Sequence, residues 1–338
     1  MKAFVLDAPG APLRKYDREV PRPGRGQVVV KNFATTLNFH DLLNIQGVVP
    51  NLVWPHVPFS DNCGEIVALG EDCGCWQAGE RVIANFFPDW IDGAPVQPYC
   101  WSVYGDNRDG FLQEYTLVEA KSLVRAPDYL SHVEAAALGC AGLTAWRCLA
   151  VEARIQPGQV VVVQGIGGVS LFALQFAKMF GAKVILTSSS DDKLAFGKEL
   201  GADHGINYRK CPDWNAEVVD LTDGEGADVI VEIGGADTLA RSLDAVKFNG
   251  HISVIGVRSG AGMPATISPE GLLIKNVSMR GITVGSARHL ADMCRALTQH
   301  PIRPVIHRTF QMDEVSAASA LMQGESHMGK IAIDISAG

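Results

Sequence analysis

The chain has 338 residues, 47% of them hydrophobic, and a formal net charge of −8. At ~150 residues per domain, this length predicts about two domains, each able to bury a core. The acidic balance and the lack of any Lys/Arg block argue against nucleic acid or an anionic membrane as the main partner. The sequence shows no signal-peptide pattern and no run of about 18 apolar residues, so we expect a cytoplasmic protein with a small-molecule substrate.

The first third of the sequence is β-rich and irregular. The segments QVVVKNFATTL, GEIVALG and RVIA are predicted strands, and stretches rich in Gly, Pro and Asp separate them. Eight scattered cysteines are expected to be free thiols. Cys73 and Cys75 form a C-x-C pair, but no second pair lies at zinc-ribbon spacing, so we expect a surface turn there.

Regular alternation begins at Ser131, which forms a capping-box pattern with Glu134. The apolar strand 160–164 leads into a helix at 169–180, and a last apolar strand is expected near 279–285. Between them we expect, in order, strand KVILTS, helix 191–200, strand GIN, helix 213–222, strand DVIVEI, helix 237–247 and strand HISVIG. Six strands with intervening helices predict an α/β fold with a doubly wound parallel sheet.

After about residue 287 the sequence returns to the style of its first third. We therefore predict one domain made of residues 1–125 and 288–338, into which an α/β domain of residues 126–287 is inserted. A cleft between two such domains is the default place to expect a site.

The most informative segment is VVVVQGIGGVSLFALQFAKMFGAKVILTSSS, in which a buried strand runs through a glycine-rich turn into a helix. Gly165 permits the tight turn, and Gly167 lets the backbone approach a pyrophosphate, which N–H groups at the helix start, Gly168 and Val169, can bind. Ser170 replaces the third glycine of the G-x-G-x-x-G pattern and is small enough for close packing. This context predicts dinucleotide binding; the alternative is a glycine-rich turn in an α/β domain without a cofactor.

The second strand ends at Ser188 and Ser189, where an NAD-binding domain has an acidic residue for the ribose 2′-hydroxyl. Small hydroxyl side chains leave room for a 2′-phosphate, and Lys193 and Tyr208 can add a charge and a donor. We therefore expect NADP(H) to be preferred over NAD(H). The alternative is that Lys193 is a solvated charge on a helix.

Several motifs in the same order resemble the medium-chain dehydrogenase/reductase superfamily: GEIVALGEDCGCWQAGERV, AGLTAW, GIGGVSLFALQFAKMFGAKVI, KELGADHGINYR and SHMGKIAI. The chain is most similar to the zinc-independent, quinone-oxidoreductase-like and NAD(P)-dependent alcohol-dehydrogenase-like branch. The resemblance implies a GroES-like catalytic domain of distorted β-barrel type, a Rossmann domain, and a homodimer or homotetramer. In such a dimer the edge strand MRGITVG would pair with its copy.

The resemblance also marks the positions at which zinc-dependent relatives bind metal. Asn38 stands in the place of a Cys ligand, Ser60 and Asp61 stand in the places of a His-Glu pair, and Cys140 is retained at the third ligand position. One soft ligand beside an amide and a hydroxyl does not make a zinc site, which needs about three protein ligands. The loop expected to hold a four-Cys structural zinc has Cys100 alone. We therefore expect neither zinc.

The catalytic candidates are also implied by the resemblance. The residues matching Asn38 and Asp41 lie near the nicotinamide in this branch, so Asn38 is expected to donate to the substrate or the nicotinamide ribose, and Asp41 to contact the cofactor or to support that contact. The alternative is an Asn in the turn before a short helix, with Asp41 at the positive end of the helix dipole. Thr144 matches a position close to the nicotinamide. His40 is a lone histidine and is expected to be a surface or hydrogen-bonded residue rather than a metal ligand.

Three further cofactor contacts are expected from the same resemblance. Gly256 and Val257 end the strand HISVIGV and should face the carboxamide through backbone groups. Lys330 matches a position near the cofactor phosphates, with an exposed lysine at a strand start as the alternative. Aromatic residues of the loop after RVIA either line the substrate mouth or hold the loop in place: Phe86, Trp90 and Trp101.

Without a metal as Lewis acid, hydride transfer suits acceptors that are already activated by conjugation. The sequence therefore favours a zinc-independent, NADPH-dependent reductase of a quinone, an α,β-unsaturated carbonyl or an activated ketone. A metal-free alcohol dehydrogenase acting on a secondary or aromatic alcohol is a second interpretation. A non-catalytic NADPH-binding protein is a third.

Overall fold

The computed structural model describes residues 1–256 and 265–336 of the chain, so the predicted contact of Val257 lies outside the described residues. The chain divides into two compact units. One comprises Met1–Leu143 and Val284–Gly338, and the other comprises Thr144–Thr283. One unit is thus inserted in the other, but the boundaries differ from the predicted 125/126 and 287/288.

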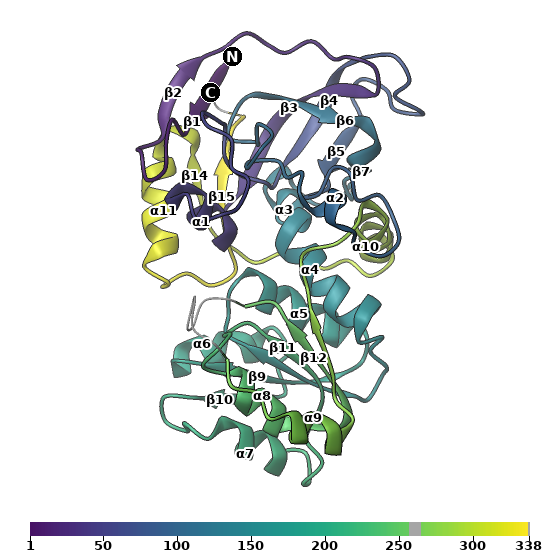
Figure 1. The fold of residues 1–338 in the computed structure, drawn as a ribbon, viewed down its shortest axis with the longest axis vertical. Coiled ribbons are helices and arrows are strands. Elements are labelled where there is room, and N and C mark those ends of the chain that lie inside the picture. Colours follow the sequence, from purple (N-terminus) through teal and green to yellow (C-terminus); the bar gives the residue numbers. More distant parts are fainter. Residues whose placement is uncertain (257–264, 337–338) are drawn as a thin grey trace. The chain divides into compact units, whose positions relative to one another are not determined.

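The first unit is built on a mostly antiparallel sheet with the strand order β14-β15-β3-β4-β5-β7, in which β6 also pairs with β3, and β1 and β2 form a separate hairpin (Figure 1). Its strands are β1 (Lys2–Val5), β2 (Arg14–Asp17), β3 (Gln27–Thr36), β4 (Cys63–Leu69), β5 (Arg81–Ala84), β6 (Tyr115–Glu119), β7 (Leu123–Arg125), β14 (Ile306–Gln311) and β15 (Lys330–Asp334). Its helices are α1 (Phe39–Gln46), α2 (Gln97–Cys100), α3 (His132–Ala136), α10 (Ala287–Gln299) and α11 (Val315–Gln323), with short helical turns at Ala120–Ser122, Leu138–Gly142 and Met312–Glu314.

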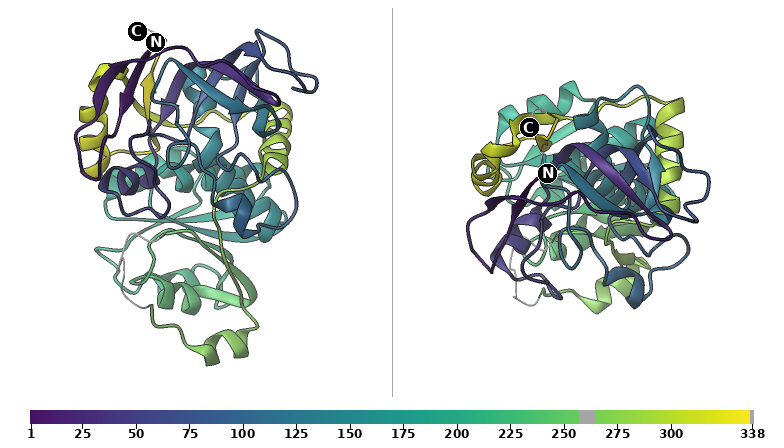
Figure 2. Two further views of the ribbon diagram at one scale, coloured as in Figure 1. Left: turned by 45° about the horizontal axis from the view of Figure 1, so that its top comes forward. Right: turned by 90° about the horizontal axis from the view of Figure 1, so that it is seen from above.

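Both ends of the chain contribute to one hydrophobic cluster of this unit. Phe4 and Val5 of β1 pack with Ile331 and Ile333 of β15, and Leu37 after β3 joins them. The purple and yellow segments accordingly share this unit in Figure 2. Burial of these residues explains why the last strand belongs with the first third of the sequence.

Helix α3 explains the displaced first boundary. It packs on β3, β4, β14 and β15, all of which are strands of the first unit. Ser131 caps it as predicted, with its hydroxyl accepting from Glu134 N and the Glu134 carboxylate accepting from Ser131 N. The helical segment therefore resembles the inserted domain in local sequence but packs on the other sheet.

The second unit is a parallel sheet with the strand order β10-β9-β8-β11-β12-β13. Its strands are β8 (Val160–Gln164), β9 (Lys183–Ser188), β10 (His204–Asn207), β11 (Ala227–Glu232), β12 (Val246–Val254) and β13 (Ser278–Gly281). Its helices are α5 (Gly168–Met179), α6 (Asp191–Glu199), α7 (Trp214–Asp220), α8 (Leu239–Ala245) and α9 (Pro269–Lys275); α4 (Leu143–Trp146) and a π-helical turn at Arg147–Glu152 precede them. The predicted α/β fold with a doubly wound sheet is confirmed. The strand order reverses between β8 and β11, and ligands of such sheets bind beside the carboxyl ends of the strands at that point.

Two predicted elements of this sheet end at other residues. The helix expected at 237–247 stops at Ala245, because Val246 already pairs with Ala227 in β12. The strand expected near 279–285 ends at Gly281, and Val284 has a φ of 42°, which an extended strand does not allow. The predicted pairing of this edge strand between subunits stays a prediction.

The cysteines are free thiols, as expected. Within residues 1–256 and 265–336, helices are too short or too polar to cross a membrane.

Candidate active site

The opening of α1 carries the first candidate residues. Leu37 N donates to Ile331 O at 2.9 Å, and α1 begins directly after Asn38. Asp41 lies in the first turn, where its Oδ2 accepts from Asn38 N at 2.6 Å. This contact uses the backbone of Asn38, so its side chain is available for other partners.

The Asn38 side chain belongs to a buried cluster with Asp61 and Lys330. Lys330 Nζ donates to Leu37 O at 2.7 Å, to Asn38 Oδ1 at 2.5 Å and to Asp61 Oδ2 at 3.1 Å. Asn38 Nδ2 donates to Asp61 Oδ2 at 2.9 Å. Asn38, Asp61 and Lys330 are 6%, 0% and 3% exposed. The ammonium group is therefore enclosed, and its three N–H groups have three acceptors.

Asp61 is at the centre of this cluster. Thr36 Oγ1 donates to Asp61 Oδ2 at 2.5 Å, and Thr35 Oγ1 donates to the backbone oxygen of Asp61 at 2.6 Å. Asp61 Oδ1 is buried and has no hydrogen-bond partner in the described part of the chain. A Cβ at Gly139 would lie 3.0 Å from this oxygen, so the backbone before Cys140 passes close to the carboxylate.

Burial shifts two neighbouring groups toward their neutral forms. It raises the pKa of Asp41 to about 7; the charge of Asp61 adds to this effect, while His40 and Lys330 oppose it. Burial also raises the pKa of the Cys140 thiol well above its usual range, and Asp61 again adds to the shift. Cys140 is therefore a thiol rather than a thiolate at neutral pH.

Lys330 lies in a place that the sequence did not indicate. Its expected contact with the cofactor phosphates stays a prediction, and the alternative of an exposed lysine is wrong because Lys330 is buried. Asp61 is the residue whose role was missed, because it appeared only as a poor replacement for a metal ligand. The sequence signal for both is a charged residue next to an apolar strand or loop, in KIAIDI and VPFSDNC.

Four further residues were expected at the site: Phe86, Trp90, Trp101 and Thr144. Trp90 is fully buried and donates from Nε1 to Gly93 O at 3.0 Å, so it holds the loop in place. Phe86 is also buried, whereas Trp101 is 44% exposed. Thr144 is buried on α4, in the second unit.

The glycine-rich turn between β8 and α5 has the conformation that its sequence predicts. Gly165 has a φ of 72°, which favours glycine, and α5 begins at Gly168 with Val169 in its first turn. Ser170 Oγ donates to Gln164 O at 2.7 Å and so ties the helix to the strand end. A Cβ at Gly167 would meet open space, as a turn that admits a pyrophosphate requires.

The end of β9 supplies the candidate contacts for the adenosine ribose. Ser188 is buried, Ser189 is partly exposed, and Tyr208 N donates to Ser188 O at 3.1 Å. Lys193 lies in the first turn of α6, where its backbone N donates to the capping hydroxyl of Ser190 at 3.3 Å. The structure thus brings Ser188, Ser189 and Tyr208 together, with Lys193 on the adjoining helix.

A buried polar network beside the glycine-rich turn was not anticipated. Gln164 Nε2 donates to Glu232 Oε2 at 2.7 Å, and Gln164 Oε1 accepts from Ile233 N and Gly234 N at 3.1 Å. Gly256 N donates to Glu232 O at 3.0 Å, and a Cβ at Gly256 would lie 1.5 Å from Ile233 O. The carboxyl ends of β8, β11 and β12 are therefore fixed to one another by this network.

Comparison with known proteins finds one family domain in each unit, and the second match continues into α10 of the first unit. Residues 24–128 match the alcohol dehydrogenase GroES-like domain, and residues 168–299 match the zinc-binding dehydrogenase domain. A zinc-type alcohol dehydrogenase-like protein of Schizosaccharomyces pombe is 41% identical over 329 residues, which cover 96% of this chain and 95% of the relative. An acryloyl-coenzyme A reductase of Sulfurisphaera tokodaii is 25% identical over 342 residues, which cover 98% of this chain and 99% of the relative. The solved structure of a protein from Sinorhizobium meliloti 1021, described as an alcohol dehydrogenase, has a TM-score of 0.94 at 39% identity and covers 99% of this chain and 98% of its own.

Proposed function

We propose that this chain, a member of the medium-chain dehydrogenase/reductase family in its zinc-type alcohol dehydrogenase-like group, is an NADPH-dependent reductase that works without zinc. Membership of the family makes it a nicotinamide-dependent oxidoreductase. Its acceptor is a quinone, an α,β-unsaturated carbonyl or an activated ketone. The observation that carries this proposal is the buried ammonium group of Lys330, which binds the side-chain oxygens of Asn38 and Asp61.

The side chains at the metal positions of zinc-dependent relatives do not suit zinc here. Asn38 Oδ1 and Asp61 Oδ2 already accept from the Lys330 ammonium, so a divalent cation there would face a buried positive charge. Ser60 offers a neutral hydroxyl. Cys140 is then the one soft ligand left at these positions, and a zinc site needs about three protein ligands. The cation of this cluster is therefore the lysine side chain, and no step of the mechanism needs a metal.

Asn38 is the hydrogen-bond donor that we assign to the oxyanion formed during reduction. One N–H of its Nδ2 donates to Asp61, and the other faces Ser60 Oγ at 3.5 Å, at the outer limit of a hydrogen bond. Lys330 donates to the Asn38 oxygen and so polarises the amide, which strengthens its N–H groups as donors. A bound dihydronicotinamide supplies the hydride.

The adenosine end supports NADPH over NADH. β9 ends at Ser188, and Ser188 and Ser189 stand where an NAD-binding domain has an acidic residue, whose charge would repel a 2′-phosphate. The nearby Asp191 carboxylate is already paired, since Asn207 Nδ2 donates to it at 2.7 Å and Lys210 donates to it as well. Its charge is thus partly neutralised before a phosphate approaches.

The relatives support two reactions, the reduction of a conjugated acceptor and the oxidation of an alcohol. The acryloyl-coenzyme A reductase acts, by its name, on a conjugated acyl group, which favours the α,β-unsaturated carbonyls. The alcohol dehydrogenase-like relatives favour a second candidate, the metal-free oxidation of a secondary or aromatic alcohol.

The test is NADPH oxidation by chelator-treated protein with a quinone, an enone and a plain saturated ketone, with NADH run in parallel. We expect turnover with the conjugated acceptors, little with the saturated ketone, and a preference for NADPH. Activity only in the direction of alcohol oxidation would support the second candidate. Activity that disappears on chelation and returns with zinc would overturn the metal-free mechanism.

A further inference from the structure

His40, in the first turn of α1 two residues after Asn38, pairs with the carboxylate of Asp106 in the loop before β6. His40 Nε2 is 2.9 Å from Asp106 Oδ1 and 3.0 Å from Asp106 Oδ2. The His40 side chain is 27% exposed and the Asp106 side chain 7%. Phe86 covers the imidazole edge-to-face, with ring centroids 5.3 Å apart. One nitrogen of the ring is therefore fixed by a carboxylate, and Phe86 packs against the ring.

Asp106 is itself held from behind. Asn44 Nδ2 donates to Asp106 Oδ1 at 2.8 Å and to Gly105 O at 2.6 Å, and Asn44 Oδ1 contacts His56 Nε2 at 3.0 Å. These contacts fix the carboxylate, and the carboxylate fixes the ring orientation of His40. A carboxylate that orients an imidazole is the arrangement by which proteins position a proton-transferring histidine.

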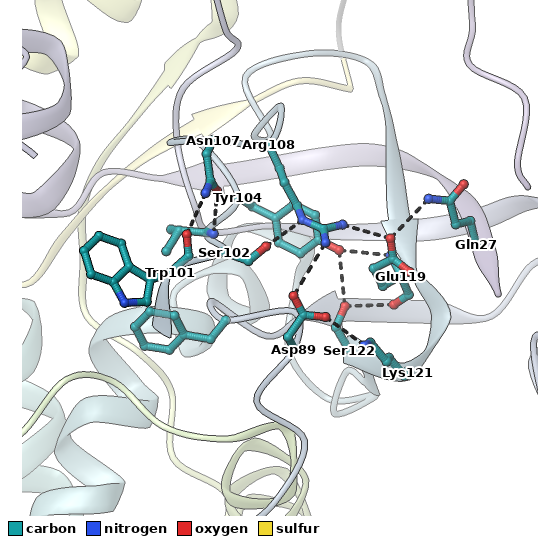
Figure 3. Close-up of polar contacts among 12 residues, drawn as sticks. Gln27, Asp89, Trp101, Ser102, Tyr104, Asn107, Arg108, Glu119, Lys121 and Ser122 are labelled. Carbon is teal, nitrogen blue, oxygen red and sulfur yellow. Dashed lines mark hydrogen bonds and ion pairs between the residues drawn. The ribbon is translucent and has the colours of Figure 1, made fainter. Parts of the chain in front are cut away.

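The loop that carries Asp106 is anchored on its other side as well (Figure 3). Asn107 Nδ2 donates to Trp101 O at 2.6 Å, and the guanidinium of Arg108 donates to Glu119 Oε1 at 2.8 Å. The loop is thus connected to β6 through Glu119. This anchoring keeps Asp106 in place while the histidine gains or loses a proton.

The His40 side chain is partly exposed, and within residues 1–256 and 265–336 its other ring nitrogen, Nδ1, has no hydrogen-bond partner. His40 can therefore exchange a proton with water at Nδ1 while Nε2 stays on Asp106.

We propose that His40, oriented by Asp106, is the proton donor of the reduction. This inference rests on the proposed function. The acceptor gains a hydride from the cofactor and one proton, and the electron pair of its π bond takes up that proton. The N–H bond at His40 Nδ1 breaks as the new bond to the substrate forms, the imidazolium becomes a neutral imidazole, and water returns a proton to Nδ1.

The charges around His40 agree with this role. Burial alone would lower the pKa of His40, but the hydrogen bond and charge of Asp106, together with the charge of Asp41 on the same helix, outweigh it and raise the pKa above its ordinary value. Phe86, which faces the ring from the loop after β5, carries no charge. A larger fraction of His40 is therefore protonated at neutral pH than for an unperturbed histidine.

The test compares the pH dependence of kcat for the native enzyme, His40→Gln and Asp106→Asn, with His300→Gln as the control because His300 is exposed at the end of α10. We expect native kcat to fall as pH rises through the pKa of His40. His40→Gln should lower kcat about 10²-fold at neutral pH and abolish this alkaline limb. Asp106→Asn should move the limb to lower pH, and His300→Gln should match the native profile.

A titration of the histidine ring signals by NMR, in the protein without cofactor, gives a readout that does not depend on turnover. The His40 signal should titrate above an ordinary histidine, and it should titrate lower in Asp106→Asn. A His40→Gln enzyme that keeps the alkaline limb would overturn the inference even if its rate is reduced, because the histidine would then only position other groups. A native enzyme that reduces no acceptor would instead refute the proposed function.

Discussion

Removing the Lys330 ammonium alone should strongly destabilise the first unit. Lys330→Met keeps an unbranched apolar stem but leaves the fully buried Asp61 carboxylate with donors from Thr36 and Asn38 only. Removal of one partner from a buried ion pair costs about 3–5 kcal/mol. Leu37 O and Asn38 Oδ1 also lose their donor. We therefore expect the free energy of unfolding to fall by at least about 3 kcal/mol.

The matched variant is Asp61→Asn in the Lys330→Met background. The introduced amide has nearly the shape of the Asp61 carboxylate but carries no charge. The double variant should therefore be more stable than Lys330→Met alone. Replacement of both members of a buried ion pair by neutral groups is often close to neutral in stability. The two substitutions should therefore not be additive, with a coupling of up to about 3 kcal/mol.

The assay is urea unfolding of the native protein, both single variants and the double variant, followed by circular dichroism and tryptophan fluorescence. A Lys330→Met protein within about 1 kcal/mol of the native one would mean that the pair contributes no more than an exposed ion pair, contrary to this expectation. A double variant less stable than Lys330→Met would refute it as well, because the Asp61 charge would then have another compensating partner.

Three further outcomes are expected. Burial holds the pKa of Asp41 at about 7 against an ordinary 3.8, so the folded state keeps a proton that the unfolded chain loses. Relative to Asp41→Asn, the native protein should therefore lose about 4 kcal/mol of stability as pH rises from about 4 to 8. A stability difference between the two proteins that stays constant with pH in urea unfolding would contradict this. Ser189→Asp should reduce kcat/KM for NADPH and favour NADH, whereas Ser189→Asn should not; equal effects of both would rule out a charge mechanism. Cys140→Ser should keep turnover within a few-fold because the thiol is uncharged, and a collapse of activity would point to a metal ligand.

The fold follows closely from local sequence in the second unit. The runs VVVVQ and ADVIVE are buried on both faces, so their composition identifies β8 and β11 as central parallel strands. The domain boundary did not follow, because α3 has the local features of a helix from an α/β domain while its partners are strands of the first unit. Periodicity indicates that a helix buries one face, but it does not indicate which sheet receives that face.

The candidate site was predictable only in part. The glycine-rich turn is formed by neighbours in the chain, so Gly165 could be predicted from its local pattern, whereas Asn38 was indicated only by the resemblance to a family. Lys330 and Asp61 are 269 positions apart, and His40 and Asp106 are 66 positions apart. These pairs exist because β15 and the loop before β6 fold back onto β3 and α1, and a single sequence does not encode such contacts in its local pattern.

The metal content of the active enzyme decides whether Lys330 takes the place of zinc. The protein would be produced with zinc in the medium, and zinc per chain and NADPH-dependent turnover would be measured in the same sample before and after chelation. Because Lys330 supplies the positive charge of the cluster, we expect full turnover with well under one zinc per chain and no change on chelation. One zinc per chain, with turnover that is lost when it is removed, would contradict it.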